Sequence, residues 1–127
     1  MNLKHWLAIV AIALASRTGF ALEIVPYDAG SFAQARAAGQ VTALEFHSGW
    51  CPICVMQDRG IRELKDGKSL ERVTVFVADF IKEAELRQRL GVTTFATLVV
   101  FRGAEEKARA TGEFQPEKLR QLFDKAL

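Results

Sequence analysis

The chain has 127 residues, enough for one domain, and half of them are hydrophobic while a quarter are charged. That balance is typical of a folded globular protein and excludes a disordered chain or a fibrous repeat. The formal net charge of +2 comes from Lys4 and Arg17, because residues 22–127 carry 15 basic and 15 acidic side chains. A nucleic-acid partner is therefore not expected, since no basic excess remains to bind phosphates.

Residues 1–21 have the pattern of a cleaved signal peptide. Lys4 and the terminal amino group make a positive start, and residues 6–15 form an uncharged apolar run. The following segment ends in Gly19-Phe20-Ala21, with small residues at the two positions that a signal peptidase reads. We predict cleavage after Ala21, with Ala15 as the second candidate. A retained anchor is the weaker alternative, because a membrane span takes about 20 apolar residues.

Strand-like and helix-like segments alternate through residues 22–127. Ser31, with Gln34 three positions later, predicts the start of a helix, and Gly39 predicts its end. Pro52 suits the first turn of a second helix, where its missing N–H costs nothing. The predicted strands are 23–27, 41–47, 73–78, 97–101 and 107–111, and the predicted helices are 31–39, 52–64, 81–90 and 116–127.

This order of elements predicts an α/β fold. Strands separated by helices indicate parallel crossovers, and the last two strands are close enough in sequence to form a hairpin. We therefore expect a central mixed sheet with helices on both faces, formed by residues 22–127 as one domain.

Cys51 and Cys54 are the two cysteines of the chain, and they lie between a predicted strand and a predicted helix. A bridge between them would close a very small loop and stabilise the fold little, so the pair is there to open and close or to hold a metal. The first turn of a helix has unsatisfied amide groups and a positive dipole end, which stabilise a thiolate. We predict that Cys51 is an exposed nucleophile and that Cys54, one turn deeper, resolves the mixed disulfide.

Metal and haem are the alternative uses of such a pair. Covalent haem attachment needs a His directly after the second cysteine, and Val55 stands there. A structural zinc site usually takes four ligands, and only Glu45 and His47 lie nearby in sequence. We expect no metal and no cofactor, although four thiolates from two chains could still hold zinc or an Fe–S cluster.

Glu45 is a second candidate catalytic residue because it interrupts an apolar strand that should be covered on both faces. A buried carboxyl group is costly unless it is neutral or paired, and burial raises its pKa. Such a group is suited to take the proton from Cys54. The alternative is a glutamate at the sheet edge that reaches solvent. His47 shares its strand phase and could tune the site, or simply be solvated or hydrogen-bonded.

Several motifs of the chain are together similar to the thioredoxin superfamily. They are residues 46–54 (FHSGWCPIC), Glu45 six positions before the first cysteine, residues 77–79, residues 91–101 (GVTTFATLVVF) and Gly112. The resemblance covers residues 22–127 and implies thiol–disulfide exchange, with Cys51 attacking and Cys54 resolving. It also implies that Glu45 is the family's buried acid and that Trp50 is the aromatic residue flanking the site.

Two positions depart from the family pattern. Ala96 stands where the family has a cis-proline, and a non-proline cis bond costs about 2.5–4 kcal/mol, so we expect a trans peptide. The resemblance implies that substrates dock on Trp50, Phe95, Ala96 and Thr97. We expect this loop to lie against Cys51, with a free amide donor at Ala96 and a more open thiol pair. Val75 replaces the basic partner of the buried acid.

The resemblance implies a monomeric, periplasmic thiol–disulfide oxidoreductase acting on exported proteins, with a membrane electron donor as a candidate partner. We expect a reductase. A disulfide-forming oxidase is the alternative, but that family usually has His where Ile53 stands and a large helical insertion, which this sequence lacks. A metal-binding module is the alternative from another functional class.

Overall fold

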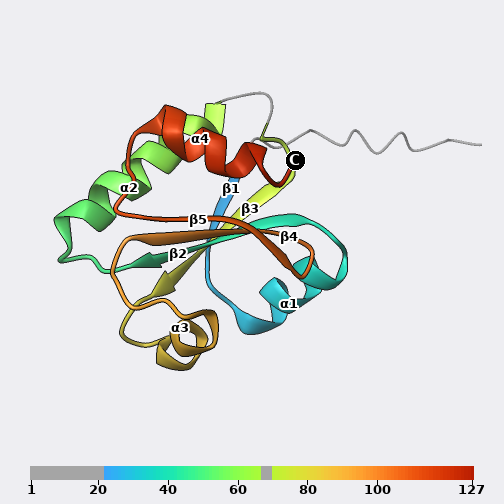
Figure 1. Ribbon diagram of the computed structural model, residues 1–127, viewed down its shortest axis with the longest axis horizontal. Helices are drawn as coiled ribbons and strands as arrows, with labels where there is room; N and C mark the ends of the chain where they lie inside the picture. The colour runs from blue at the N-terminus through green and yellow to red at the C-terminus, as the bar shows by residue number, and fades with distance from the viewer. Residues whose placement is uncertain (1–21, 67–69) are drawn as a thin grey trace, which may run out of the picture.

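The computed structural model describes residues 22–66 and 70–127, so the predicted signal peptide lies outside the described residues. Strands and helices alternate along the described chain up to a final hairpin and helix (Figure 1). The elements are β1 (Glu23–Pro26), α1 (Ala29–Ala37), β2 (Val41–His47), α2 (Pro52–Glu63), the 3-10 turn η2 (Leu64–Asp66), β3 (Val73–Asp79), α3 (Ala84–Leu90), β4 (Thr97–Arg102), β5 (Glu105–Thr111) and α4 (Pro116–Asp124).

The five strands form one mixed sheet in the order β1-β3-β2-β4-β5. β3 runs parallel to β1 and β2, whereas β4 is antiparallel to β2 and β5. The expected α/β fold and the final hairpin are confirmed, but a parallel crossover through α3 is wrong. The Phe80 amide donates to the His47 carbonyl, and the Ala96 amide donates to the Phe46 carbonyl. Both bonds lie at the C-terminal end of β2, so the chain leaves β3 and enters β4 at the same end of the sheet.

Helices cover both faces of the sheet, as predicted (Figure 1). Burial of apolar side chains stabilises the packing of these helices on the sheet. Each Å² of apolar surface removed from water contributes about 25 cal/mol. α2 and α4 pack on one face through Ile61, Leu119, Leu122 and Phe123. α1 and α3 pack on the other through Phe32, Ala35 and Leu86. The central strand β2 is consequently covered on both sides.

Three elements begin at residues other than the predicted ones. Asp28, not Ser31, caps α1, because its carboxylate accepts from the Ser31 amide at 2.8 Å. α3 begins at Ala84 rather than at residue 81, since Asp79 accepts from the amides of Ile81 and Lys82 at 2.9 Å and holds a turn there. β5 begins at Glu105, two residues early. No helix in the described part of the chain is long and apolar enough to span a membrane.

Candidate active site

The junction between β2 and α2 places Cys51 at the N-terminus of a helix. Cys51 is the N-cap of α2, with an extended backbone, and its Sγ accepts from the Cys54 amide at 3.3 Å. The sulfur therefore occupies the place of a capping oxygen. The Cys51 amide donates to the Ser48 carbonyl at 3.2 Å, which closes the turn before the helix. A negative sulfur at this point is favoured by the helix dipole and by the amide donor.

Both thiols are free and largely covered by protein. Cys51 is 9% exposed and Cys54 is 0% exposed, and they form one cluster with Ala96, against which Phe95 packs. Cys51 is not exposed as predicted, because the loop around Ala96 covers it, but it is the more accessible of the two thiols. Ala96 packs against the two cysteines, and a thiol pair more open than in relatives with proline stays a prediction.

The Cys54 thiol holds its proton firmly. Burial and the hydrogen bond with the Cys51 side chain raise the pKa of Cys54 to about 11, while the Ser48 and Ala96 amides act in the opposite direction. Cys54 is therefore a neutral thiol at physiological pH and needs a base before it can attack a disulfide.

The loop before β4 confirms one expectation and corrects another. Described residues contain no cis peptide bond, so Phe95–Ala96 is trans, and Ala96 takes a left-handed backbone with φ of 57°. Its amide donates to the Phe46 carbonyl at 3.0 Å and its carbonyl accepts from the Gly112 amide at 2.9 Å. The Ala96 amide is consequently not a free donor for the thiols, although it still lowers the pKa of Cys54.

Gln57 is a site residue that the sequence analysis missed. Its side chain is fully buried, and Nε2 donates to the Ala96 carbonyl at 2.8 Å and to the Glu113 carbonyl at 3.0 Å. This amide ties the helix that carries the thiols to the loop that covers them. A signal was present, because Cys54, Gln57 and Ile61 share one face of the helix and a polar residue there needs a partner.

A row of stacked side chains supports the rim of the site. Trp50, which is 70% exposed, meets the edge of Phe95 at 4.8 Å between ring centroids. Phe95 stacks on Phe80 at 3.9 Å, and the Arg87 guanidinium lies 4.0 Å from the centre of the Phe80 ring. The row holds Trp50 beside the thiol loop while leaving most of its surface free.

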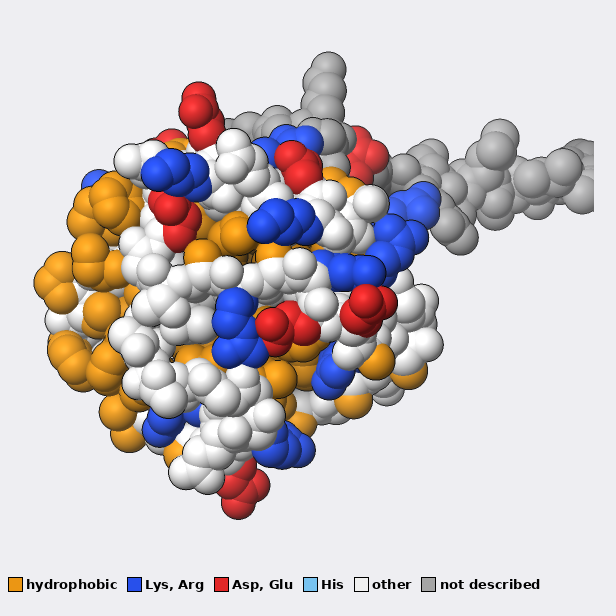
Figure 2. Space-filling model, viewed as in Figure 1, with side chains coloured by type: hydrophobic (Ala, Val, Ile, Leu, Met, Phe, Trp, Pro, Cys, Tyr) orange, Lys and Arg blue, Asp and Glu red, His pale blue; other side chains and the backbone are white. Residues whose placement is uncertain are grey.

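Apolar side chains extend from Trp50 along the first turns of α2. Ile53, Val55 and Met56 are exposed there, and Figure 2 shows hydrophobic side chains gathered at the end of the molecule where β2 leads into α2. Exposed apolar groups around a buried thiol suit docking of an extended polypeptide. Substrate contacts of Trp50, Phe95 and Ala96 stay predictions.

The Thr97 hydroxyl makes its hydrogen bonds with the loop before β4 and with β5. The residue is buried, its hydroxyl donates to the Thr94 carbonyl at 2.7 Å, and the same oxygen lies 2.9 Å from the Thr111 hydroxyl. The hydroxyl is therefore engaged within the protein. A role of Thr97 in substrate binding stays a prediction. Its backbone would have to make the contact, because its hydroxyl is already hydrogen-bonded.

Glu45 lies in the middle of the sheet as an isolated acid. It is 0% exposed, and both of its carboxylate oxygens lack a hydrogen-bond partner. Burial, with a smaller effect of Asp58, raises the pKa of Glu45 to about 8, and Arg62 opposes the shift. The expected burial of Glu45 is confirmed, and burial shifts its pKa in the expected direction. Its role in proton transfer stays a prediction.

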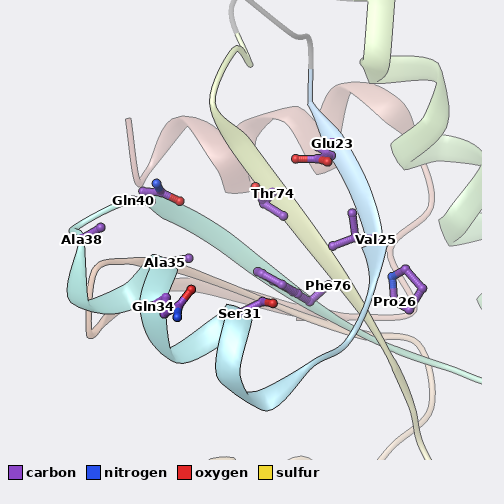
Figure 3. Close-up of a pocket in the computed structure, with 10 residues that line it drawn as sticks. All are labelled: Glu23, Val25, Pro26, Ser31, Gln34, Ala35, Ala38, Gln40, Thr74 and Phe76. Carbon is purple, nitrogen blue, oxygen red and sulfur yellow. The ribbon is translucent and has the colours of Figure 1, made fainter.

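The described residues form a pocket away from the thiols but no metal-binding cluster. A pocket of about 500 Å³ between β1 and α1 is lined by side chains such as Glu23, Gln34 and Phe76, and by neither cysteine (Figure 3). Within residues 22–66 and 70–127 no group of three His, Cys, Asp or Glu side chains is placed to hold a metal ion. The two thiols alone supply half of a tetrahedral zinc site.

Comparisons with known proteins agree with this geometry. The family model described as Thioredoxin matches residues 23–125. Trxlp from Edwardsiella tarda is similar at 28% identity, with a TM-score of 0.75, covering 80% of this chain and 98% of that one. Thioredoxins from Malassezia sympodialis (20% identity, TM-score 0.70, 84% and 93% covered) and Trypanosoma brucei brucei (18%, 0.69, 85% and 93%) share the fold. No curated protein matches the sequence.

Proposed function

Since the chain belongs to the thioredoxin family, we propose that it is an exported thiol–disulfide oxidoreductase that reduces disulfides in other exported proteins. The observation that carries the proposal is the asymmetry of the two thiols. Cys51 caps α2 and is partly accessible, whereas Cys54 is fully buried with a pKa of about 11. Cys51 is therefore placed to attack the substrate disulfide, and Cys54 is placed to resolve the mixed disulfide afterwards.

The first step is attack on a substrate disulfide. The Cys51 thiolate bonds to one substrate sulfur, the substrate disulfide breaks, and the departing thiolate takes a proton from solvent. In the mixed disulfide the Cys51 sulfur is bonded, so its hydrogen bond no longer raises the pKa of the Cys54 thiol as it does in the free pair. Formation of the mixed disulfide thus prepares Cys54 for deprotonation.

The second step needs a base, and Glu45 is the candidate. By strand alternation Glu45 lies on the same face of β2 as Ala43, which packs beneath α2 and α4. A carboxylate whose pKa is near 8 is a better acceptor for a thiol proton than an ordinary glutamate. The Glu45 carboxylate takes the proton of the Cys54 thiol in this step. Cys54 then attacks Cys51, the Cys51–Cys54 disulfide forms, and the second substrate thiolate leaves.

The surroundings of Cys51 favour the reductase direction. Strongly oxidising relatives stabilise their reduced form, which raises the reduction potential. Here Pro52 and Ile53 between the cysteines carry no charge, and the cluster around the sulfurs is completed by Ala96 and Phe95. The signal-peptide pattern of residues 1–21 supports export to the periplasm, where a membrane electron donor would have to reduce the Cys51–Cys54 disulfide again.

A glutathione redox titration of residues 22–127 tests the direction. We expect a midpoint close to that of thioredoxins, about −270 mV, and a value close to about −120 mV would make the protein an oxidase. Mass spectrometry of protein from the periplasmic fraction tests export. A mature chain that starts at Leu22 is expected, whereas a full-length chain retained in the cytosol would contradict the proposal.

Cysteine variants test the assignment of roles. Cys51→Ser should abolish disulfide reduction, because it removes the accessible nucleophile. Cys54→Ser should trap mixed disulfides with substrates, since nothing is left to resolve them. Alkylation of the folded, reduced protein should modify Cys51 first. Faster modification of Cys54 would reverse the two roles.

A further inference from the structure

Two buried polar groups without partners face each other beside the thiol site. His47 Nδ1 lies 3.7 Å from Glu45 Oε1, and neither atom has a hydrogen-bond partner or accessible surface. The two residues are two positions apart in β2, so their side chains project from the same face of the sheet. Because buried polar atoms are almost always hydrogen-bonded, two unpaired atoms that face each other call for an explanation.

His47 lies between Glu45 and a pocket at the surface. The Glu45 side chain is 0% exposed, whereas the His47 side chain is 24% exposed, and that surface belongs to atoms other than Nδ1. His47 borders a pocket of about 290 Å³ together with Ile24, Val25, Pro26, Asp58, Arg62 and Val77. The imidazole therefore touches the isolated acid on one side and solvent on the other.

The charged groups around this pair are Asp58 and Arg62 of α2 and Asp79 at the end of β3. Asp58 and Arg62 form an ion pair at 2.7 Å on one side of the pocket. Asp58 raises the pKa of Glu45, and Arg62 lowers it. Asp79 is the strand partner of His47 and feels its charge. Asp79 therefore adds a carboxylate on the β3 side of His47.

We propose that His47 is the proton outlet of Glu45, so that each proton taken from Cys54 leaves the sheet through the imidazole ring. The inference rests on the proposed function, since it needs Glu45 to receive that proton. The Glu45 carboxyl donates its proton to His47 Nδ1, and the resulting imidazolium releases the proton of its other ring nitrogen to water in the pocket, which restores the carboxylate. Rotation of the ring then lets the Nδ1 proton exchange with pocket water, and reprotonation of the other nitrogen returns the imidazole to its starting tautomer before the next turnover. No electrons move in this step.

The outlet answers a need that Glu45 cannot meet by itself. An acid with no accessible surface and no hydrogen-bond partner has no direct route to water, and its raised pKa of about 8 favours the protonated form. A Glu45 that stayed protonated after one turnover would not serve as a base in the next. In this chain Val75 stands where the family has a basic partner of the buried acid, and His47 supplies a titratable group beside Glu45 instead.

Stopped-flow mixing of reduced residues 22–127 with dithiobis(nitrobenzoate) separates the two chemical steps. Attack by Cys51 releases the first coloured thiolate, and attack by Cys54 on the mixed disulfide releases the second. At pH 7 most Glu45 is protonated, because its pKa is about 8, and it must lose this proton through residue 47 before it can accept one from Cys54. In His47→Ala at pH 7 and low buffer, we therefore expect the second phase to slow by at least about tenfold while the first phase stays unchanged. Added imidazole should restore the second phase, because it fits the space left beside Glu45.

Three further variants make the result specific. His47→Gln should be slow and insensitive to imidazole, since the amide fills the site but cannot relay a proton. Glu45→Gln should be slow and also insensitive, which shows that imidazole does not act on Cys54 directly. Gln121→Ala, on the exposed side of α4, should behave like the wild type.

The outcomes separate this inference from the function on which it rests. If Glu45→Gln is slow but His47→Ala matches the wild type from pH 5 to 9, the outlet is wrong and the proposed chemistry stands. A slow His47→Ala that imidazole does not restore would make His47 a structural residue only, and also overturns the outlet. If the wild type shows no second phase, the proposed function itself fails.

Discussion

Ala96 takes a backbone conformation that suits glycine, with φ of 57° at a buried position against the thiols. A residue with a Cβ costs about 1–2 kcal/mol in the left-handed region. The surroundings hold it there, because Phe46 accepts its amide and both Gly112 and Gln57 donate to its carbonyl. The residue that departs from the family pattern is thus locked by hydrogen bonds rather than by a ring.

Substitution of Ala96 should show this lock directly. Ala96→Gly is expected to change the free energy of unfolding by less than about 1 kcal/mol, since relief of backbone strain and loss of the buried methyl oppose each other. Ala96→Pro should destabilise by about 3 kcal/mol or more, because proline needs φ near −65° and cannot donate to Phe46. Urea unfolding measures both, and equal tolerance of the two changes would refute the lock.

At the scale of elements, the position of the thiol helix depends on close contact between α2 and the segment that leads into α4. A Cβ built on Gly60 would overlap the Phe114 carbonyl oxygen and would come within 2.8 Å of Leu119 Cδ1. Gln57, one turn earlier, donates to the neighbouring Glu113 carbonyl. Glycine is therefore needed at residue 60 for space, in the interior of a helix where it is otherwise unfavourable.

A pair of glycine substitutions tests this contact. Gly60→Ala should destabilise the fold by about 1–3 kcal/mol through overpacking, in spite of a gain in helix propensity of about 1 kcal/mol. Gly30→Ala in α1 is the matched control, since its Cβ would meet only Asp28 Oδ2 at 3.5 Å. The control should gain about 0.5 kcal/mol or stay neutral. Thermal unfolding that ranks the two variants in the opposite order would contradict the packing argument.

For the whole molecule, the buried Glu45 makes stability depend on pH. Its pKa is 4.5 as an unperturbed group and about 8 in the folded protein. Between these values the folded state binds a proton that the unfolded state has lost, so stability falls as pH rises. Below pH 4.5 both states are protonated, and above about pH 8 both are ionised, so the contribution is flat outside this window.

The expected loss is about 1.4 kcal/mol per pH unit between roughly pH 5 and 8, on the order of 5 kcal/mol in total. Urea unfolding of the wild type and of Glu45→Gln over this range isolates it, because the variant cannot titrate at residue 45. The difference between the two curves should grow with pH in favour of the variant. Glu105→Gln, at an exposed site, should keep the wild-type slope. A difference that does not change with pH would mean that Glu45 is ionised throughout.

Much of the fold and the central chemistry could be predicted because their signals are local. Apolar runs of strand length, Pro52 at a helix start and the spacing of Cys51 and Cys54 each depend on neighbouring residues only. The acid in β2 was conspicuous for the same reason, since a carboxyl group inside an apolar strand stands out without any knowledge of the rest. The cap of α1 was misplaced by three residues because Ser31, a residue type that often caps helices, lies in the first turn and donates its own amide to Asp28, the actual cap.

The sequence by itself determined the alternation of elements, the two thiols at a helix start and the acid inside an apolar strand. Only the tertiary structure decided the antiparallel direction of β4, the left-handed backbone of Ala96, the bond from Gln57 to a carbonyl 39 residues away, and the meeting of Glu45 with His47 at 3.7 Å. The physical reason is range. Helix starts and apolar periodicity follow from the chain's own geometry, whereas these contacts exist only after packing has brought distant segments, or the two side chains of one strand face, into a shared dry interior.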